Sequence, residues 1–187
     1  MNYSEELANV IKDYLDEKDM LYDFNDKLGR FRFRMSLEGR IKDISHIIFV
    51  KSNLYLVYAI APLGVDPEDK KAMSEMAEFI CRANYGLNIG NFEMDFYDGE
   101  IRFKICVDCD NTTPTREILC NSIFCPAAMY EIYGSGILDV IIGKRSPKEA
   151  VEKCEEAADD NPGDFSDEPQ EDDRDFTDDS DKTIKLT

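Results

Sequence analysis

The stretch Asn84–Lys104 reads NYGLNIGNFEMDFYDGEIRFK, and it predicts a helix end, a strand, a tight turn and a second strand. Residues 91–96 alternate between apolar and polar side chains, so Phe96 is expected on the buried side of its strand. Asp98 and Gly99 are typical of a two-residue hairpin turn, because both tolerate positive φ angles. We therefore expect a hairpin with one buried face, which the rest of the chain has to cover.

Outward from this hairpin, apolar periodicity and turn residues predict the remaining elements. Short polar links between the first strands favour an antiparallel sheet with helices packed on it. The sequence therefore predicts an α+β fold with a five-stranded antiparallel sheet. The expected order is a helix (residues 3–16), three strands (30–37, 41–50 and 54–61), a helix from residue 67, the hairpin, a helix from residue 113 that continues over 129–142, and a last helix over 147–158.

Charge divides the chain of 187 residues, whose formal net charge is −18, into two parts. Residues 155–187 hold 14 of the 40 acidic residues but only 3 of the 22 basic ones. A segment so charged and so poor in apolar residues cannot offset the entropy of becoming ordered. We expect an α+β domain over residues 1–158 and a disordered acidic tail over residues 159–187.

Composition also bears on partners and location. Nucleic acid is not an expected partner, because phosphate binding relies on a positive surface and this chain is strongly acidic. No apolar run is long enough for a membrane helix, and the N-terminus lacks the basic-then-apolar pattern of a signal peptide. We therefore expect no membrane association, a cytoplasmic protein, and six cysteines that remain free thiols.

Catalytic and metal-binding patterns are weak. Cys106 and Cys109 have the spacing of a zinc or redox pair, but they end a predicted strand and no glycine knuckle accompanies them. His46 is the only histidine and stands alone in a predicted strand, which favours a structural role over that of a general base. The sequence predicts no enzyme, no metal and no cofactor.

A basic row is more informative. Arg30, Arg32 and Arg34 lie on one side of the first predicted strand, and Arg102 and Lys104 on one side of the last. A solvated polar face is the simpler interpretation, since one such face is normal in antiparallel sheets. The alternative is a docking surface for an acidic peptide or protein client.

The chain itself carries an acidic peptide of this kind. Residues 164–181 contain Phe165 and Phe176, each surrounded by acidic residues. We hypothesise that this part of the tail lies on the basic face in cis and competes with a partner. A solubilising segment without a binding role is the alternative.

The predicted helix over residues 129–142 is apolar nearly all round. Such a helix is buried on several sides, either within its own core or by pairing with a second copy of the chain. In the second case, Gly134 and Gly136 would permit close approach of the two copies. For the homodimer, the expected interface residues are Tyr130, Tyr133, Ile137 and Ile141.

Three stretches carry a resemblance to a known family: NYGLNIGNFEMDFYDGEIRFKICVD (84–108), TPTREIL (113–119) and GKRSPKEAVEKC (143–154). In their order the chain resembles the YbjN-like family, labelled a putative bacterial sensory transduction regulator, whose fold is similar to class I type III secretion chaperones. The resemblance implies a non-catalytic domain that dimerises and holds an extended client. It supplies no catalytic residues to carry over.

Together these observations predict a non-catalytic protein-interaction module, a chaperone-like adaptor or regulator. A client would bind through apolar side chains and hydrogen bonds to an edge strand. The alternative is a small-molecule sensor with an apolar pocket between the sheet and the methionine-rich second helix.

Overall fold

The computed structural model describes residues 3–160 of the chain. It contains four helices and one sheet of six antiparallel strands, so the predicted α+β class is confirmed and the predicted count of five strands is wrong. The elements are α1 (Glu5–Glu17), β1 (Asp23–Asn25), β2 (Arg30–Ser36), β3 (Asp43–Val50), β4 (Leu54–Gly64), α2 (Lys70–Tyr85), β5 (Asn91–Met94), β6 (Glu100–Asp108), α3 (Arg116–Ile141) and α4 (Pro147–Asp159).

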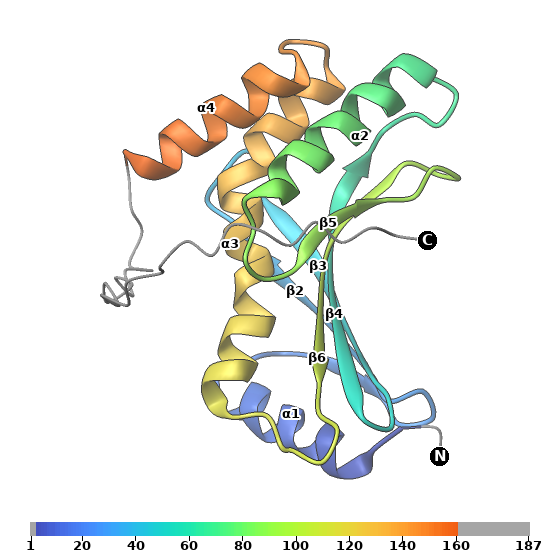
Figure 1. Cartoon of the computed structure of the whole chain (residues 1–187). Helices are drawn as coiled ribbons and strands as arrows, with labels where there is room; N and C mark the ends of the chain where they lie inside the picture. The colour runs from blue at the N-terminus through green and yellow to red at the C-terminus, as the bar shows by residue number, and fades with distance from the viewer. Residues whose placement is uncertain (1–2, 161–187) are drawn as a thin grey trace, which may run out of the picture.

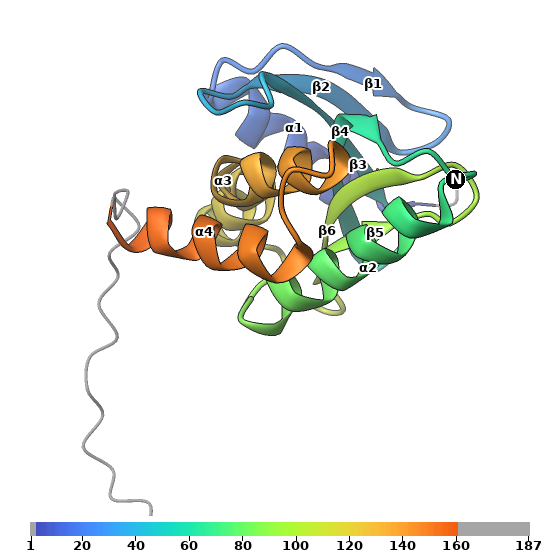
Figure 2. The same ribbon diagram turned by 90° about the horizontal axis from the view of Figure 1, so that it is seen from above.

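The strands lie in the order β1-β2-β3-β4-β6-β5, and the helices gather on one side of the sheet (Figure 1). Seen along the strands, the sheet curves around α3 (Figure 2). The extra strand is β1, only three residues long, which pairs with β2 at the edge. Its brevity explains why the alternation of polar and apolar residues, which needs at least four positions, does not reveal it.

The core lies between the sheet and the helices. Along β2, β3, β4 and β6, every second side chain is buried on the side of the helices, as the period of two requires. The largest fully buried side chains of these strands and of β5 are Tyr55, Phe31, Phe92, Phe103, Ile44, Ile48 and Ile101. One face of the sheet is thereby committed to the core.

Helix α3 crosses the middle of this buried face. The hydroxyl of Tyr130 lies 3.2 Å from the carbonyl oxygen of Ala59 and 3.1 Å from that of Ile101, and the Ser122 hydroxyl lies 2.6 Å from that of Tyr55. Buried hydroxyls need such partners, so these contacts fix α3 over β4 and β6.

Gly136 allows α2 and α4 to approach α3 closely, and Gly134 allows the close approach of Ile41, which lies between β2 and β3. A Cβ atom on Gly136 would lie 2.7 Å from the Cys154 sulfur and 2.8 Å from the Phe79 ring, and one on Gly134 would lie 3.2 Å from Ile41. Both glycines therefore serve contacts within the chain. For residues 129–142, the core interpretation holds and the expected use of these glycines in a dimer is wrong.

The β5–β6 hairpin differs from its prediction. Strand β5 ends at Met94, and Phe96 is 66% exposed in a longer connection. The Asp95 carboxylate accepts the Tyr97 N–H at 2.8 Å, and the Asp95 carbonyl accepts the Gly99 N–H at 2.8 Å. This Asx turn begins the reversal at Asp95, one residue before Phe96, so Phe96 is not part of the strand.

Candidate functional site

The second face of the sheet is not covered by a helix of the described chain (Figures 1 and 2). Strand register places the five predicted cations on this face: Arg32 pairs with Ile47, Ile47 with Tyr58, and Tyr58 with Lys104. We call this surface the open sheet face. It consists of Arg30, Arg32 and Arg34 on β2, Ser45, Ile47 and Phe49 on β3, Leu56, Tyr58 and Ile60 on β4, and Arg102, Lys104 and Cys106 on β6.

The centre of the open sheet face is apolar. Two strands rich in half-buried hydrophobic side chains separate the β2 cations from those on β6. Phe49 and Tyr58 pack edge to face with their ring centroids 5.9 Å apart, and Arg102 lies 4.5 Å above the Tyr58 ring. Such an arrangement offers a partner apolar contact in the middle and charge at one rim.

The two groups of cations differ in their pairing. Within residues 3–160, no carboxylate lies within ion-pair distance of Arg30 or Arg32, and the buried Nε of Arg30 has no hydrogen-bond partner. Arg34 makes only a 3.5 Å contact with Asp43, in which both side chains are exposed. Within residues 3–160, Arg30 and Arg32 therefore have no ion pair, and the nearest acidic neighbour by strand register is Asp23 of β1, which faces Arg32.

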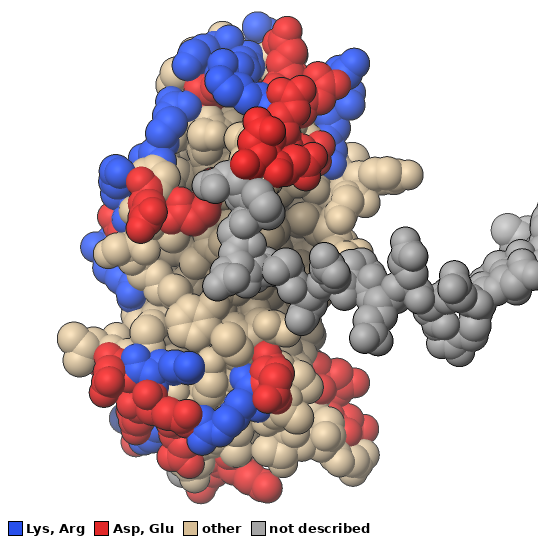
Figure 3. Space-filling view, turned by 90° about the vertical axis from the view of Figure 1, so that its left-hand side faces the viewer, with Lys and Arg blue, Asp and Glu red and all other residues tan. Residues whose placement is uncertain are grey.

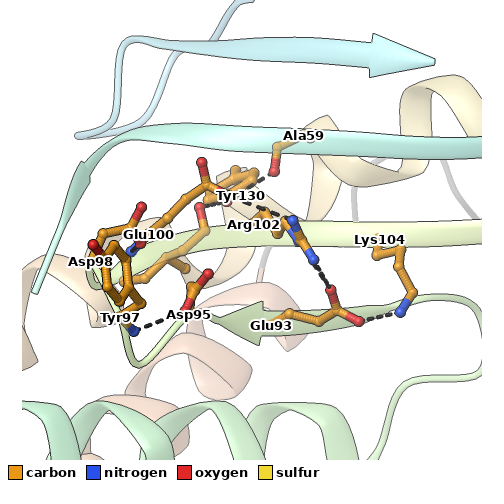
Figure 4. Close-up of polar contacts among 10 residues, drawn as sticks. Ala59, Glu93, Asp95, Tyr97, Asp98, Glu100, Arg102, Lys104 and Tyr130 are labelled. Carbon is orange, nitrogen blue, oxygen red and sulfur yellow. Dashed lines mark hydrogen bonds and ion pairs between the residues drawn. The ribbon is translucent and has the colours of Figure 1, made fainter. Parts of the chain in front are cut away.

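On β6 the charge is already neutralised. The Glu93 carboxylate of β5 accepts a hydrogen bond from Arg102 at 3.0 Å and another from Lys104, as Figure 4 shows. Burial raises the pKa of Glu93, but the bonds from Lys104 and Arg102 outweigh it, so the pKa lies below its ordinary value. Glu93 stays ionised, and Arg102 and Lys104 are weaker candidates for binding an acidic partner than the β2 arginines.

A hollow lies beside the unpaired arginines. It has a volume of about 430 Å³ and is lined by Arg32, Phe33, Arg34, Ser45, His46 and Ile47. It is open and shallow, which suits a single side chain of a docked segment better than an enclosed small molecule. Positive charge at its rim and apolar atoms within it favour an anionic segment with an apolar anchor.

The β5 edge is blocked at its centre. The Asn84 side chain accepts the Phe92 N–H at 2.8 Å and donates to the Phe92 carbonyl at 2.9 Å. It thus occupies the outward hydrogen-bonding groups of that residue, as a further strand would. At Phe92, β5 therefore offers no free backbone group to a client strand, and the predicted addition of a client to an edge strand stays a prediction.

The predicted dimer residues lie mostly inside the chain. Tyr130, Tyr133 and Ile137 are at most 5% exposed, and only Ile141 is half-buried. Tyr130, Tyr133 and Ile137 are therefore not available for the expected dimer interface, because their side chains fill the core between α3, the sheet and the other helices, whereas Ile141 stays a prediction. The outer side of α3 instead carries Asn121, Phe124, Cys125, Ala128, Met129 and Ile132, and Figure 3 shows an uncharged band across the middle of this side of the molecule.

His46 is fully buried and stacks on Phe33 with ring centroids 4.9 Å apart. Among the described residues neither of its ring nitrogens has a hydrogen-bond partner, and burial lowers the pKa of His46 to about 4. Cys106 is exposed while Cys109 is buried, so their thiols point apart. Residues 3–160 hold no group of three potential metal ligands and no helix with the length and hydrophobicity to cross a membrane.

The interior between α2 and the sheet is filled by side chains, including the fully buried Met76 and Phe79. The hollow next to α2 lies instead at its outer end, where Phe96 of the β5–β6 connection approaches Pro67 and Lys70. It has a volume of about 210 Å³. This geometry does not favour the predicted sensor pocket.

No family model matches the chain, and a search of curated proteins finds no match. The resemblance to the YbjN-like family therefore stays a prediction.

The apolar centre of the open sheet face was missed at the sequence level, although one signal was present: β3 and β4 carry apolar residues at nearly every position. Continuous apolar runs in an antiparallel sheet indicate that both faces make contacts.

Proposed function

We propose that this chain is a non-catalytic protein-interaction module whose open sheet face docks an acidic segment of a protein partner. The observation that carries the proposal is the unpaired β2 cations, Arg30 and Arg32, beside an apolar centre and a hollow large enough for one side chain. The bound segment would place carboxylates on β2 and an aromatic or aliphatic anchor against β3 and β4.

Its energetics would follow from this layout. Exposed ion pairs contribute little each, so affinity would come from the apolar anchor and the arginines would mainly select acidic segments and raise the association rate. A role as chaperone-like adaptor or regulator in the cytoplasm fits such binding and the family resemblance. A homodimer remains a prediction without an assigned interface, since Tyr130, Tyr133 and Ile137, first chosen for it, lie in the core.

Panning a random-peptide library on the full-length protein tests the proposal. We expect enriched peptides to combine an aromatic residue with several acidic ones. Arg32→Glu should weaken them about tenfold, which is about 1.4 kcal/mol. Lys153→Glu, an equal charge change at an exposed site on α4, is the matched control and should leave binding unchanged.

Two results would contradict the proposal: the absence of any enriched peptide, or enriched peptides that Arg32→Glu and the wild type bind equally well. Circular dichroism of both variants confirms that they are folded. Arg32 is exposed at the surface, so the circular dichroism spectrum of Arg32→Glu should equal that of the wild type.

A further inference from the structure

We propose that residues 171–181 of this chain are a resident occupant of the open sheet face, anchored by Phe176. The proposal rests on the docking surface described above and names one segment that uses it. Residues 171–181 read EDDRDFTDDSD, with seven acidic residues and one arginine around a single phenylalanine. This is the chemistry that the β2 arginines and the neighbouring apolar centre select.

Charge complementarity favours this occupant over a second copy of the chain. If the two-fold axis runs across the strands, two open sheet faces brought together place the arginines of one β2 close to those of the other. Like charges opposed in this way destabilise a contact. An acidic segment instead brings carboxylates to Arg30 and Arg32, which make no ion pair within the described chain.

Chain length decides which part of the tail reaches the face. The structure describes the chain up to Asp160, at the end of α4. Helix α4 packs on α2 and α3, which lie between it and the sheet. Two interlayer spacings of about 10 Å each, about 20 Å in all, therefore separate the axis of α4 from the sheet. Phe165 follows Asp160 by five residues and reaches at most about 17 Å, whereas Phe176 follows by 16 and reaches about 50 Å. Only Phe176 can pass around the sheet edge.

Occupation in cis would weaken binding of a partner without abolishing it. A tethered segment acts at an effective concentration on the order of 1 mM. If its intrinsic Kd is on the order of 100 μM, partners bind the intact chain about tenfold more weakly than a chain in which the segment cannot dock. A partner then occupies the open sheet face only if it binds tightly enough to displace the tethered segment.

Photo-crosslinking of the full-length protein tests this inference. The photoreactive p-benzoylphenylalanine replaces Phe176 in one protein and Phe165 in a matched control, and mass spectrometry maps the intrachain products. We expect the probe at 176 to attach to peptides of β2, β3 and β4, and the probe at 165 not to attach there. Arg32→Glu, if it weakens docking about tenfold as expected for a peptide, should lower the yield at 176 about twofold, and Lys153→Glu should not.

The inference is overturned if the probe at 176 attaches to the helices or nowhere, or if both probes label the open sheet face equally. This failure is distinct from failure of the proposed function. If library peptides bind the face while the probe at 176 does not reach it, the docking surface stands and the resident segment is wrong. If the probe labels the face but no peptide is enriched, the segment stands and a separate partner is wrong.

Discussion

His46 illustrates how one buried residue links stability to pH. Its imidazole lies in the core against Phe33, without a hydrogen-bond partner in residues 3–160. The desolvated ring resists protonation, so its pKa is about 4 in the folded chain against 6.5 for an ordinary histidine. Between these values the unfolded state binds more protons than the folded state, and the free energy of unfolding therefore falls as the pH falls.

We predict that His46→Leu flattens this acid sensitivity. From about pH 7.5 to about pH 5, the wild type should lose about 2 kcal/mol of stability through His46 alone, a loss that the variant cannot show. Urea unfolding of both proteins at the two pH values measures the difference. Groups such as Glu93 titrate in both proteins, so the difference between their pH dependences reports on His46.

Equal pH dependences of the wild type and His46→Leu would contradict this prediction. They would mean that His46 binds a proton as readily in the folded chain as in the unfolded one. Phe33→Leu serves as a control, because it removes the stacked ring and leaves the histidine. It should lower the stability at both pH values by a similar amount.

At the residue scale, the sequence predicted the side of a strand on which a side chain lies better than it predicted the partners of that side chain. Strict alternation in β2 correctly placed Arg30, Arg32 and Arg34 on one side, because the period of two is a property of the backbone. It could not show that Glu93 compensates Arg102 and Lys104 while Arg30 and Arg32 make no ion pair within residues 3–160. That difference depends on β5 lying next to β6 at the far edge of the sheet.

Among the elements, β5 is the one whose edge most needs protection. It is four residues long and ends the sheet, and Asn84 of α2 satisfies both backbone groups of Phe92. Edge strands with free backbone groups tend to pair with other chains. The Asn84 side chain thus joins α2 to β5 and closes this edge.

We predict that Asn84→Ala destabilises the chain by about 1–3 kcal/mol, because two backbone groups in a partly buried place lose their partners. Hydrogen exchange at the Phe92 amide should become faster, and exchange along β2 and β3 should not change. Asn121→Ala is the matched control, since Asn121 is exposed on α3. Unchanged exchange at Phe92 would contradict the role assigned to Asn84.

Element boundaries were predictable where the apolar pattern was long. Strands β2, β3 and β4 and helix α4 match their predictions closely. The β5–β6 connection does not, because Asp95 and Asp98 both form Asx turns and the choice of a two-residue turn ignored the first of them. When two neighbouring residues favour a turn equally, tertiary contacts decide where the chain reverses. Here these are the contacts of Gly99 with Val65.

At the scale of the whole molecule, the two sides of the sheet differ in kind. One side is covered by α1, α2, α3 and α4, and the other combines an apolar centre with positive charge on β2 (Figures 1 and 2). The apolar pattern of α3 could not tell burial within the chain from burial in a dimer, since both need apolar side chains on several sides. Only the packing of α2 and α4 against Gly136 resolves the choice.

A spectrum of the full-length 15N-labelled protein, titrated with the most enriched library peptide, tests the docking surface most directly. The account predicts shifts that cluster at amides of β2, β3 and β4, around Arg32, Ile47 and Tyr58, while those of α3 and α4 stay unchanged. The binding should weaken as salt is raised, because the β2 charges are exposed. Shifts that cluster along the uncharged side of α3, or binding indifferent to salt, would contradict it.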